Sequence, residues 1–403
     1  MDIQLPFDSP KYLSRRSPSS GLSMSVSPRS PSWKEWFRKV RGLQRHEDQC
    51  TERKVFNRNE SRKRCTVAGV KDCALRRVVM MCHGGWAETY LACCRLRESP
   101  VRPALQTLTP PNLIIPPMND LDLIPLADTI SQFPVTRATA AFLSDEGLRI
   151  LLCSLSGKIK KIRLGGLKIT EKGWRILAAF ISMNEQLQSL EIRETLIVEG
   201  VVACLVEAIN KSSLDRLSLR KCGPMTARVF QETNVPFIGI GGDQGILEIL
   251  PHKTKIRGIS ISEIPMNNLD WLLPLCPMLV ELELRKCSIT SDLLNPILDK
   301  LENIERVGLA ANDIFPGVRI DKLCNCEILD ISETPIASLD GLVGEKMQVL
   351  RLYNTSISND QILEAVQSSK LIRVEKNNLD PSVAEICLKH MAFPSLFRFS
   401  HIV

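Results

Sequence analysis

The chain has 403 residues, 44% of them hydrophobic and 24% charged, and this balance argues against both a mostly disordered chain and a membrane protein. Its 14 cysteines are too few for a disulfide scaffold and include no Cys-x-x-Cys pair, so we expect a reducing compartment, the cytoplasm or the nucleus. The sequence shows no apolar signal-peptide core and no stretch of about 18 apolar residues, so neither secretion nor a transmembrane segment is predicted.

Positive charge is concentrated near the N-terminus. Residues 1–100 contain 20 Lys and Arg against 10 Asp and Glu, whereas the net charge of the whole chain is only +7. A basic arm attached to a near-neutral body suggests a secondary contact with nucleic acid or with another anionic surface.

Residues 1–99 are predicted to form this arm, and most of it is expected to be disordered because its first part is rich in Ser and Pro. Proline-directed phosphorylation of the Ser-Pro pairs would cancel much of the positive charge of the arm. The candidate phosphorylation sites are Ser9, Ser17, Ser27 and Ser30. An unmodified flexible tail explains the same composition.

A short amphipathic helix is predicted over residues 33–42. Ser32 and Glu35 have the spacing of a capping box. Apolar residues with helical spacing form one face, and the opposite face is basic. The apolar docking residues are Trp33, Trp36, Phe37 and Val40. Such a helix can dock on its own chain, in the groove of a partner or on a membrane, and the sequence leaves all three open.

The next two segments show no sustained periodicity. Residues 44–99 contain six cysteines without the usual spacing of zinc ligands, so no metal and no cofactor is predicted. The triplet Arg62-Lys63-Arg64 is a weak signal for nuclear import. Eight prolines between Pro100 and Pro134 argue against a regular helix or a central strand, so residues 100–132 are predicted to be an extended, Pro-rich connector.

A leucine-rich pattern repeats through the rest of the chain. The template L-x-x-L-x-L begins at residues 159, 187, 214, 235, 256, 279, 304, 326, 347 and 371. Its fourth and sixth positions place apolar side chains on one face of a short parallel strand, while positions three, five and seven point to the other face. Amphipathic stretches after the strands predict full outer helices in the longer early units and single turns in the 21-residue units.

On these registers the chain resembles the leucine-rich-repeat superfamily over residues 133–403, and its first units are similar to those of ribonuclease inhibitor. The resemblance implies an α/β fold, a curved solenoid with parallel strands on the concave face and helices or short turns outside. About ten repeats would follow a degenerate N-terminal cap whose strand is expected near Phe133. The ninth template position, which supports the turn from inside in this family, is held here by Cys222, Cys287, Asn312 and three threonines.

No enzyme is predicted, because the glycines at 239–245 lack phosphate-loop spacing and the five histidines lie far apart without a paired nucleophile. The outward strand face remains as the candidate site. Its partner-binding residues are predicted to be Lys161, Arg163, Glu191, Arg193, Arg216, Arg220, Glu281, Glu283, Arg285, Arg351 and Tyr353.

These observations predict a non-catalytic protein-protein interaction adaptor whose concave face binds a partner protein through an acidic segment. Regulation of a GTPase or a phosphatase is an alternative that rests on fold analogy alone. Binding of nucleic acid or an anionic surface by the basic arm is a second alternative. A ubiquitin-ligase substrate receptor is a weaker one, because the arm contains no clear adaptor-binding helix pair.

Overall fold

The computed structural model describes residues 85–390, except 156, 243–244, 246, 248–249, 251–254, 369–370, 372 and 376–379. Three predictions therefore lie outside the described residues. They are the phosphorylation sites Ser9, Ser17, Ser27 and Ser30, the helix at 33–42 and the basic triplet at 62–64.

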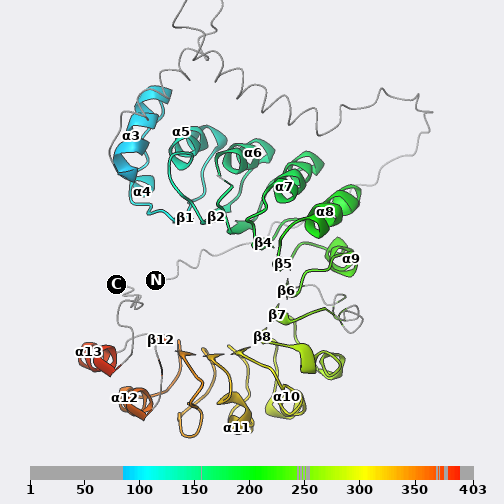
Figure 1. Ribbon diagram of the computed structural model, residues 1–403, viewed down its shortest axis with the longest axis vertical. Coiled ribbons are helices and arrows are strands. Elements are labelled where there is room, and N and C mark those ends of the chain that lie inside the picture. Colours follow the sequence, from blue (N-terminus) through cyan, green and yellow to red (C-terminus); the bar gives the residue numbers. More distant parts are fainter. Residues whose placement is uncertain are drawn as a thin grey trace, which may run out of the picture. The chain divides into compact units, whose positions relative to one another are not determined.

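Twelve parallel strands form one sheet in chain order, so each strand is hydrogen-bonded to those of the preceding and following units. The strands line the inner side of an arc and the helices lie on its outer side (Figure 1). This architecture confirms the predicted curved leucine-rich-repeat solenoid. The strands are β1 (Asn112–Ile114), β2 (Arg137–Ala141), β3 (Lys161–Gly165), β4 (Ser189–Arg193), β5 (Arg216–Arg220), β6 (Phe237–Gly241), β7 (Gly258–Ser262), β8 (Glu281–Arg285), β9 (Arg306–Gly308), β10 (Ile328–Asp330), β11 (Val349–Arg351) and β12 (Arg373–Glu375).

Strands β3 to β12 each begin at the third position of a predicted template, which confirms all ten registers. Adjacent strands pair without a shift, as in the row Lys161, Ser189, Arg216. The fourth and sixth positions are buried in the core, for example Leu217 and Leu219. Equal template positions therefore line up in rows across the sheet, and every outward row is a row of neighbouring side chains.

The outer layer changes along the chain. The helices are α3 (Trp86–Arg97), α4 (Pro103–Gln106), α5 (Asp120–Ile130), α6 (Asp145–Ser154), α7 (Glu171–Met183), α8 (Glu199–Lys211), α9 (Met225–Glu232), α10 (Ser291–Leu298), α11 (Ile320–Leu323), α12 (Asn359–Ser368) and α13 (Pro381–His390), with 3-10 turns η4 (Asp270–Leu272) and η5 (Cys276–Met278). The early units carry full helices, as predicted. The 21-residue unit that contains α9 has two turns where one was expected, because Val229 and Phe230 give it an apolar face that packs into the core.

The solenoid begins earlier than the sequence predicts. Strand β2 starts at Arg137, so the strand expected near Phe133 is wrong, and β1 adds a further unit before it. The template fits β2 only if Ala138 and Ala140 fill the two core positions, and both are buried. Because alanines replace the leucines of the L-x-x-L-x-L template in this unit, the sequence did not reveal the repeat there.

The connector predicted at 100–132 is also wrong, since this segment contains α4, β1 and α5. Pro125 lies inside α5, where the missing hydrogen bond would have gone to the carbonyl of Leu121, a residue that is exposed to water. Asn119 caps the helix by accepting a hydrogen bond from the Asp122 N–H at 2.9 Å. Four prolines flank the short strand β1, at 110, 111, 116 and 117.

Helix α3, within the arm that was predicted to be mostly disordered, packs on α5 and covers the first unit. The Trp86 indole donates a hydrogen bond to the Leu105 carbonyl at 2.7 Å and its ring lies 5.3 Å from that of Phe133. Tyr90 is buried, and this burial raises its pKa to about 12. Helix α3 is therefore part of the N-terminal cap of the solenoid.

The same backbone turn follows the strand in ten consecutive units. The residue at template position eight has a positive φ between 50° and 78° in each of them, from Phe142 to Asn354. In eight of these units its N–H donates to the carbonyl at position seven of the next unit, with N to O distances of 2.7–3.0 Å. The turn thus continues the hydrogen-bond ladder of the sheet for one more residue.

Position nine supports this turn from inside, as the family resemblance implied. The Asn312 side chain accepts hydrogen bonds from the Cys287 and Ile289 N–H groups and donates to the Leu284 carbonyl. Thr195 accepts from the Leu167 N–H at 3.1 Å. The thiols of Cys222 and Cys287 occupy equivalent buried places, which agrees with their assigned position in the template.

We predict that native Cys222 and Cys287 resist N-ethylmaleimide at pH 8, whereas the exposed Cys153 reacts. Both thiols are buried, and burial raises the pKa of Cys287 to about 11, so this thiol stays protonated and unreactive. Peptide mapping by mass spectrometry before and after unfolding in guanidinium measures the protection. Rapid labelling of either buried thiol in the native protein would contradict the assigned register.

We predict that deletion of residues 1–130 destabilises the solenoid, whereas deletion of 1–84 does not. The longer deletion removes α3, β1 and α5, whose buried side chains include Trp86, Leu113 and Leu126, so the loss is on the order of 5–10 kcal/mol. Thermal unfolding followed by circular dichroism compares the two proteins with the full chain. Equal melting temperatures for both deletions would show that the cap contributes nothing.

Candidate functional site

The structure brings the eleven predicted residues onto one face of one sheet. They lie on β3, β4, β5, β8 and β11, except Tyr353, which follows β11 by two residues. The alternation that the template predicts is clearest in β3, where Ile162 and Leu164 are buried and Arg163 is exposed. Most of these charged side chains engage one another, in three groups along the sheet.

The first group surrounds Glu191 on β4. Its carboxylate accepts from the Arg163 guanidinium at 2.8 Å and from that of Arg193 at 2.5 Å, and only 10% of its side chain is exposed. Burial alone would raise the pKa of Glu191, but the two positive charges outweigh it and lower the pKa below its usual value. Glu191 therefore stays ionised at neutral pH between two arginines.

The second group crosses four strands. Arg216 on β5 donates two hydrogen bonds, both 2.7 Å, to the carboxylate of Glu281 on β8. On the way its guanidinium lies 4.3 Å from the centre of the Phe237 ring. The Phe237 ring covers Gly258 so closely that a Cβ atom at 258 would lie 2.1 Å from the ring. The glycine is what allows the ring and the arginine to lie flat on the sheet.

Arg220 lies beside this pair and is surrounded by hydroxyl groups. Its guanidinium donates to Ser218, Ser260 and Ser262 at 2.8–3.2 Å. Ser260 in turn donates to Glu283 at 2.7 Å. Burial lowers the pKa of Arg220, and the neighbouring Arg193 acts in the same direction. The glycine-rich stretch at 237–242, which has no phosphate-loop spacing, thus forms the floor beneath these two arginines.

The third group extends from β8 to β12. Arg285 pairs with Glu333 at 2.7 Å, and Arg351 pairs with Glu375 at 3.1 Å. The hydroxyl of Tyr353 donates to the same Glu375 at 3.0 Å. The predicted residues of this half are therefore held mainly by acidic residues of their own chain.

Several participants were not among the eleven predicted residues, and Arg137 and Glu333 are two of them. Arg137 was missed because it lies on β2, where Ala138 and Ala140 replace the leucines of the template. A template that begins at Val135 places Arg137 at its third position. Glu333 was missed because it occupies position eight, in the turn, whereas the predicted residues come from positions three, five and seven of the template.

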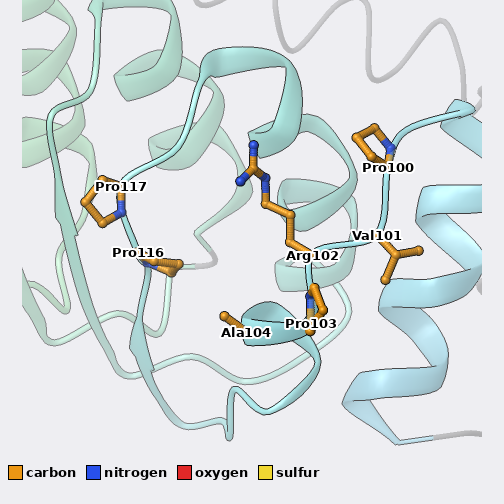
Figure 2. Close-up of a pocket in the computed structure, with 7 residues that line it drawn as sticks. All are labelled: Pro100, Val101, Arg102, Pro103, Ala104, Pro116 and Pro117. Atoms are coloured by element: carbon orange, nitrogen blue, oxygen red, sulfur yellow. The ribbon is translucent and has the colours of Figure 1, made fainter.

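A pocket of about 430 Å³ lies outside this face, at the N-terminal cap (Figure 2). It is lined by Pro100, Val101, Arg102, Pro103, Ala104, Pro116 and Pro117. Among these described lining residues Arg102 alone is ionisable, and it forms an ion pair with Asp122. The lining thus offers no nucleophile with a neighbouring base.

In the part of the chain that the structure describes, no three His, Cys, Asp or Glu side chains lie close enough together to hold a metal ion. None of the helices described is both long enough and apolar enough to cross a membrane.

No protein-family model matches the sequence, and no curated protein matches it. Among solved structures, a chain in the complex of Rad7 and Elc1 in yeast is 14% identical over 87% of this chain and 95% of that one, with a TM-score of 0.50. The leucine-rich-repeat-containing protein LegL7 from Legionella pneumophila is 13% identical over 68% and 96%, with a TM-score of 0.40. An internalin from Listeria monocytogenes is 11% identical over 67% and 75%, with a TM-score of 0.34. At these identities the similarity bears on the fold alone. The similarity to the yeast chain extends over most of the solenoid described above.

We predict that Arg216→Gln lowers the free energy of unfolding by about 2 kcal/mol, because the Glu281 carboxylate, with 6% of its side chain exposed, would keep only Arg306 at 3.9 Å. Urea unfolding of Arg216→Gln, Glu281→Gln and the double variant should give a coupling energy of about 1–2 kcal/mol. The matched control is Lys211→Gln, whose partner Glu207 is largely exposed, and its change should stay below about 0.5 kcal/mol. Additive changes at 216 and 281 would contradict a direct interaction.

Proposed function

We propose that the chain is a non-catalytic adaptor that binds a protein partner on the concave face of its solenoid. Leucine-rich-repeat proteins typically mediate protein-protein interaction, and the matching yeast chain comes from a complex of two proteins, Rad7 and Elc1. That the partner binds on the concave face is argued from the side chains of that face.

The observation that carries the proposal is that the charged side chains on β3–β12 hold one another in fixed positions. Glu191 and Glu281 are each held by arginines, and the arginines are held by neighbours in turn. A partner therefore meets donors that are already fixed, and binding loses little side-chain entropy. Preordered guanidinium groups suit the carboxylates of an acidic partner segment.

The alternatives lead to different measurements. A regulator of a GTPase would accelerate nucleotide hydrolysis by a purified GTPase, and a regulator of a phosphatase would change the turnover of a purified phosphatase. A nucleic-acid contact through the basic arm would depend steeply on salt and would be lost on deletion of residues 1–84. The structure supplies no specific observation in favour of any of them.

We predict that the triple variant Arg163→Gln, Arg193→Gln, Arg285→Gln loses a stoichiometric partner in affinity capture from extract. The matched control replaces three exposed cations of the outer helices, Arg175→Gln, Lys211→Gln and Arg228→Gln, and should retain the partner. Both proteins should give the circular dichroism spectrum of the parent, because these side chains lie on the surface of the repeats. The triple variant should unfold at a lower urea concentration, because the nearly buried Glu191 carboxylate loses both of its arginines. Recovery of the same proteins by all three baits would refute concave-face binding.

A further inference from the structure

We propose that four cations of β2–β4 form the binding site for an extended acidic peptide segment of the partner. These residues, Arg137, Lys161, Arg163 and Arg193, are called the cation stripe below. The inference rests on the proposed function and narrows it, because it assigns the acidic contact to one end of the concave face and gives the rest of that face a structural role.

The stripe contains a juxtaposition that folding alone does not favour. Arg137 and Lys161 are direct partners in the pairing of β2 with β3, so their backbones lie about 4.8 Å apart and both positive side chains leave the sheet on the same face. Arg163 follows Lys161 on the same face. Like charges directly opposite one another destabilise a sheet. In the described part of the chain neither Arg137 nor Lys161 has a carboxylate at ion-pair distance.

The electrostatics of Lys161 agree with this geometry. Burial lowers its pKa, and Arg163, Arg137 and Arg216 lower it further, while Glu191 alone opposes them. The charged form of Lys161 is thus held in an unfavourable environment. A carboxylate brought by a ligand would relieve it.

Glu191 positions the rest of the stripe without neutralising it. One carboxylate is shared by Arg163 and Arg193, whose side chains remain 52% and 54% exposed. A guanidinium has five N–H donors, so both arginines keep donors for a ligand. Their planes are fixed before the ligand arrives.

The spacing of the stripe fits an extended peptide. Arg137, Arg163 and Arg193 occupy positions three, five and seven of successive strands, so they follow a diagonal with steps of about 8 Å. Alternate side chains of an extended peptide are about 6.8 Å apart and point the same way. Flexible arginine stems can absorb the difference of about 1 Å. Carboxylates at every second residue would therefore reach all three guanidinium groups.

The remaining strands lack this excess of charge. The outward positions of β2–β4 carry four cations and one carboxylate, whereas β5–β8 carry three cations and two carboxylates. Strands β9–β12 also carry three and two. In both of these sections arginines pair with acidic residues of the chain, as Arg216 does with Glu281. An acidic ligand therefore has its most favourable electrostatic interaction with β2–β4.

The surroundings favour a polypeptide over a nucleic acid. Proteins that bind single-stranded nucleic acid combine cations with several aromatic side chains on which successive bases stack. The described strands β2–β4 carry no aromatic residue, and one exposed ring, that of Phe142, follows β2 directly. Next to the stripe, Ile114 on β1 is 70% exposed and in register with Thr139. It offers an apolar contact that a peptide side chain can use.

The test is binding of a fluorescein-labelled peptide in which three glutamates alternate with threonines, measured by fluorescence anisotropy with the full chain. The double variant Arg137→Gln, Lys161→Gln should bind it about tenfold more weakly. The same variant should melt about 1–2 °C higher, because a like-charged pair has been removed. A variant that is merely damaged would lose binding and stability together.

The matched control is Arg306→Gln on β9. Its side chain is 51% exposed, close to the 54% of Arg193, but it lies 3.9 Å from the carboxylate of Glu281 of its own chain. We expect its peptide affinity to stay within about twofold of the parent.

Three results would overturn the inference: unchanged affinity in the double variant, equal affinity for a peptide whose three glutamates are adjacent, or tighter binding of an oligothymidylate that depends on the same residues. If affinity capture depends on Arg163, Arg193 and Arg285 but the peptide does not depend on Arg137 and Lys161, the proposed function stands and the stripe does not. If the triple variant still captures the partner while the double variant loses affinity for the peptide, the proposed function fails instead.

Discussion

The left-handed turn at template position eight is the constraint on which the rest of the solenoid depends. Ten successive units, from Phe142 to Asn354, adopt it, and in all ten the strand pairs with the next strand without a shift. A non-glycine residue in this conformation is disfavoured by about 1 kcal/mol, so the turn needs support from elsewhere. The support comes from the N–H bond to the following unit and from the polar or thiol side chain at position nine.

Because the register never slips, charges that are distant in sequence become neighbours in rows. Arg216 and Glu281 are 65 residues apart in the sequence and yet are joined by two hydrogen bonds on this face. The central and C-terminal parts of the face use such pairs to satisfy their own arginines. The N-terminal part has one such carboxylate, Glu191, which pairs with Arg163 and Arg193 and leaves Arg137 and Lys161 without an ion-pair partner among the described residues.

The sequence predicted the periodic part of this arrangement and little of its side-chain chemistry. Ten strand starts follow from the spacing of Leu, Ile and Val, since a core position tolerates few other residues. The first two strands escaped because Ala138 and Ala140 are small and because prolines around Leu113 hid the pattern. The Arg216 pair could not be predicted, since it depends on an aromatic ring and a glycine on the intervening strands.

The prolines around β1 have a consequence for assembly. A parallel sheet whose units all share one register could in principle accept the first strand of another copy at its open end and grow into a fibre. Pro110, Pro111, Pro116 and Pro117 bracket a strand of three residues, and proline has no N–H to donate to an incoming strand. The residues that hid the first repeat in the sequence are thus suited to terminate the sheet, so that one chain remains one solenoid.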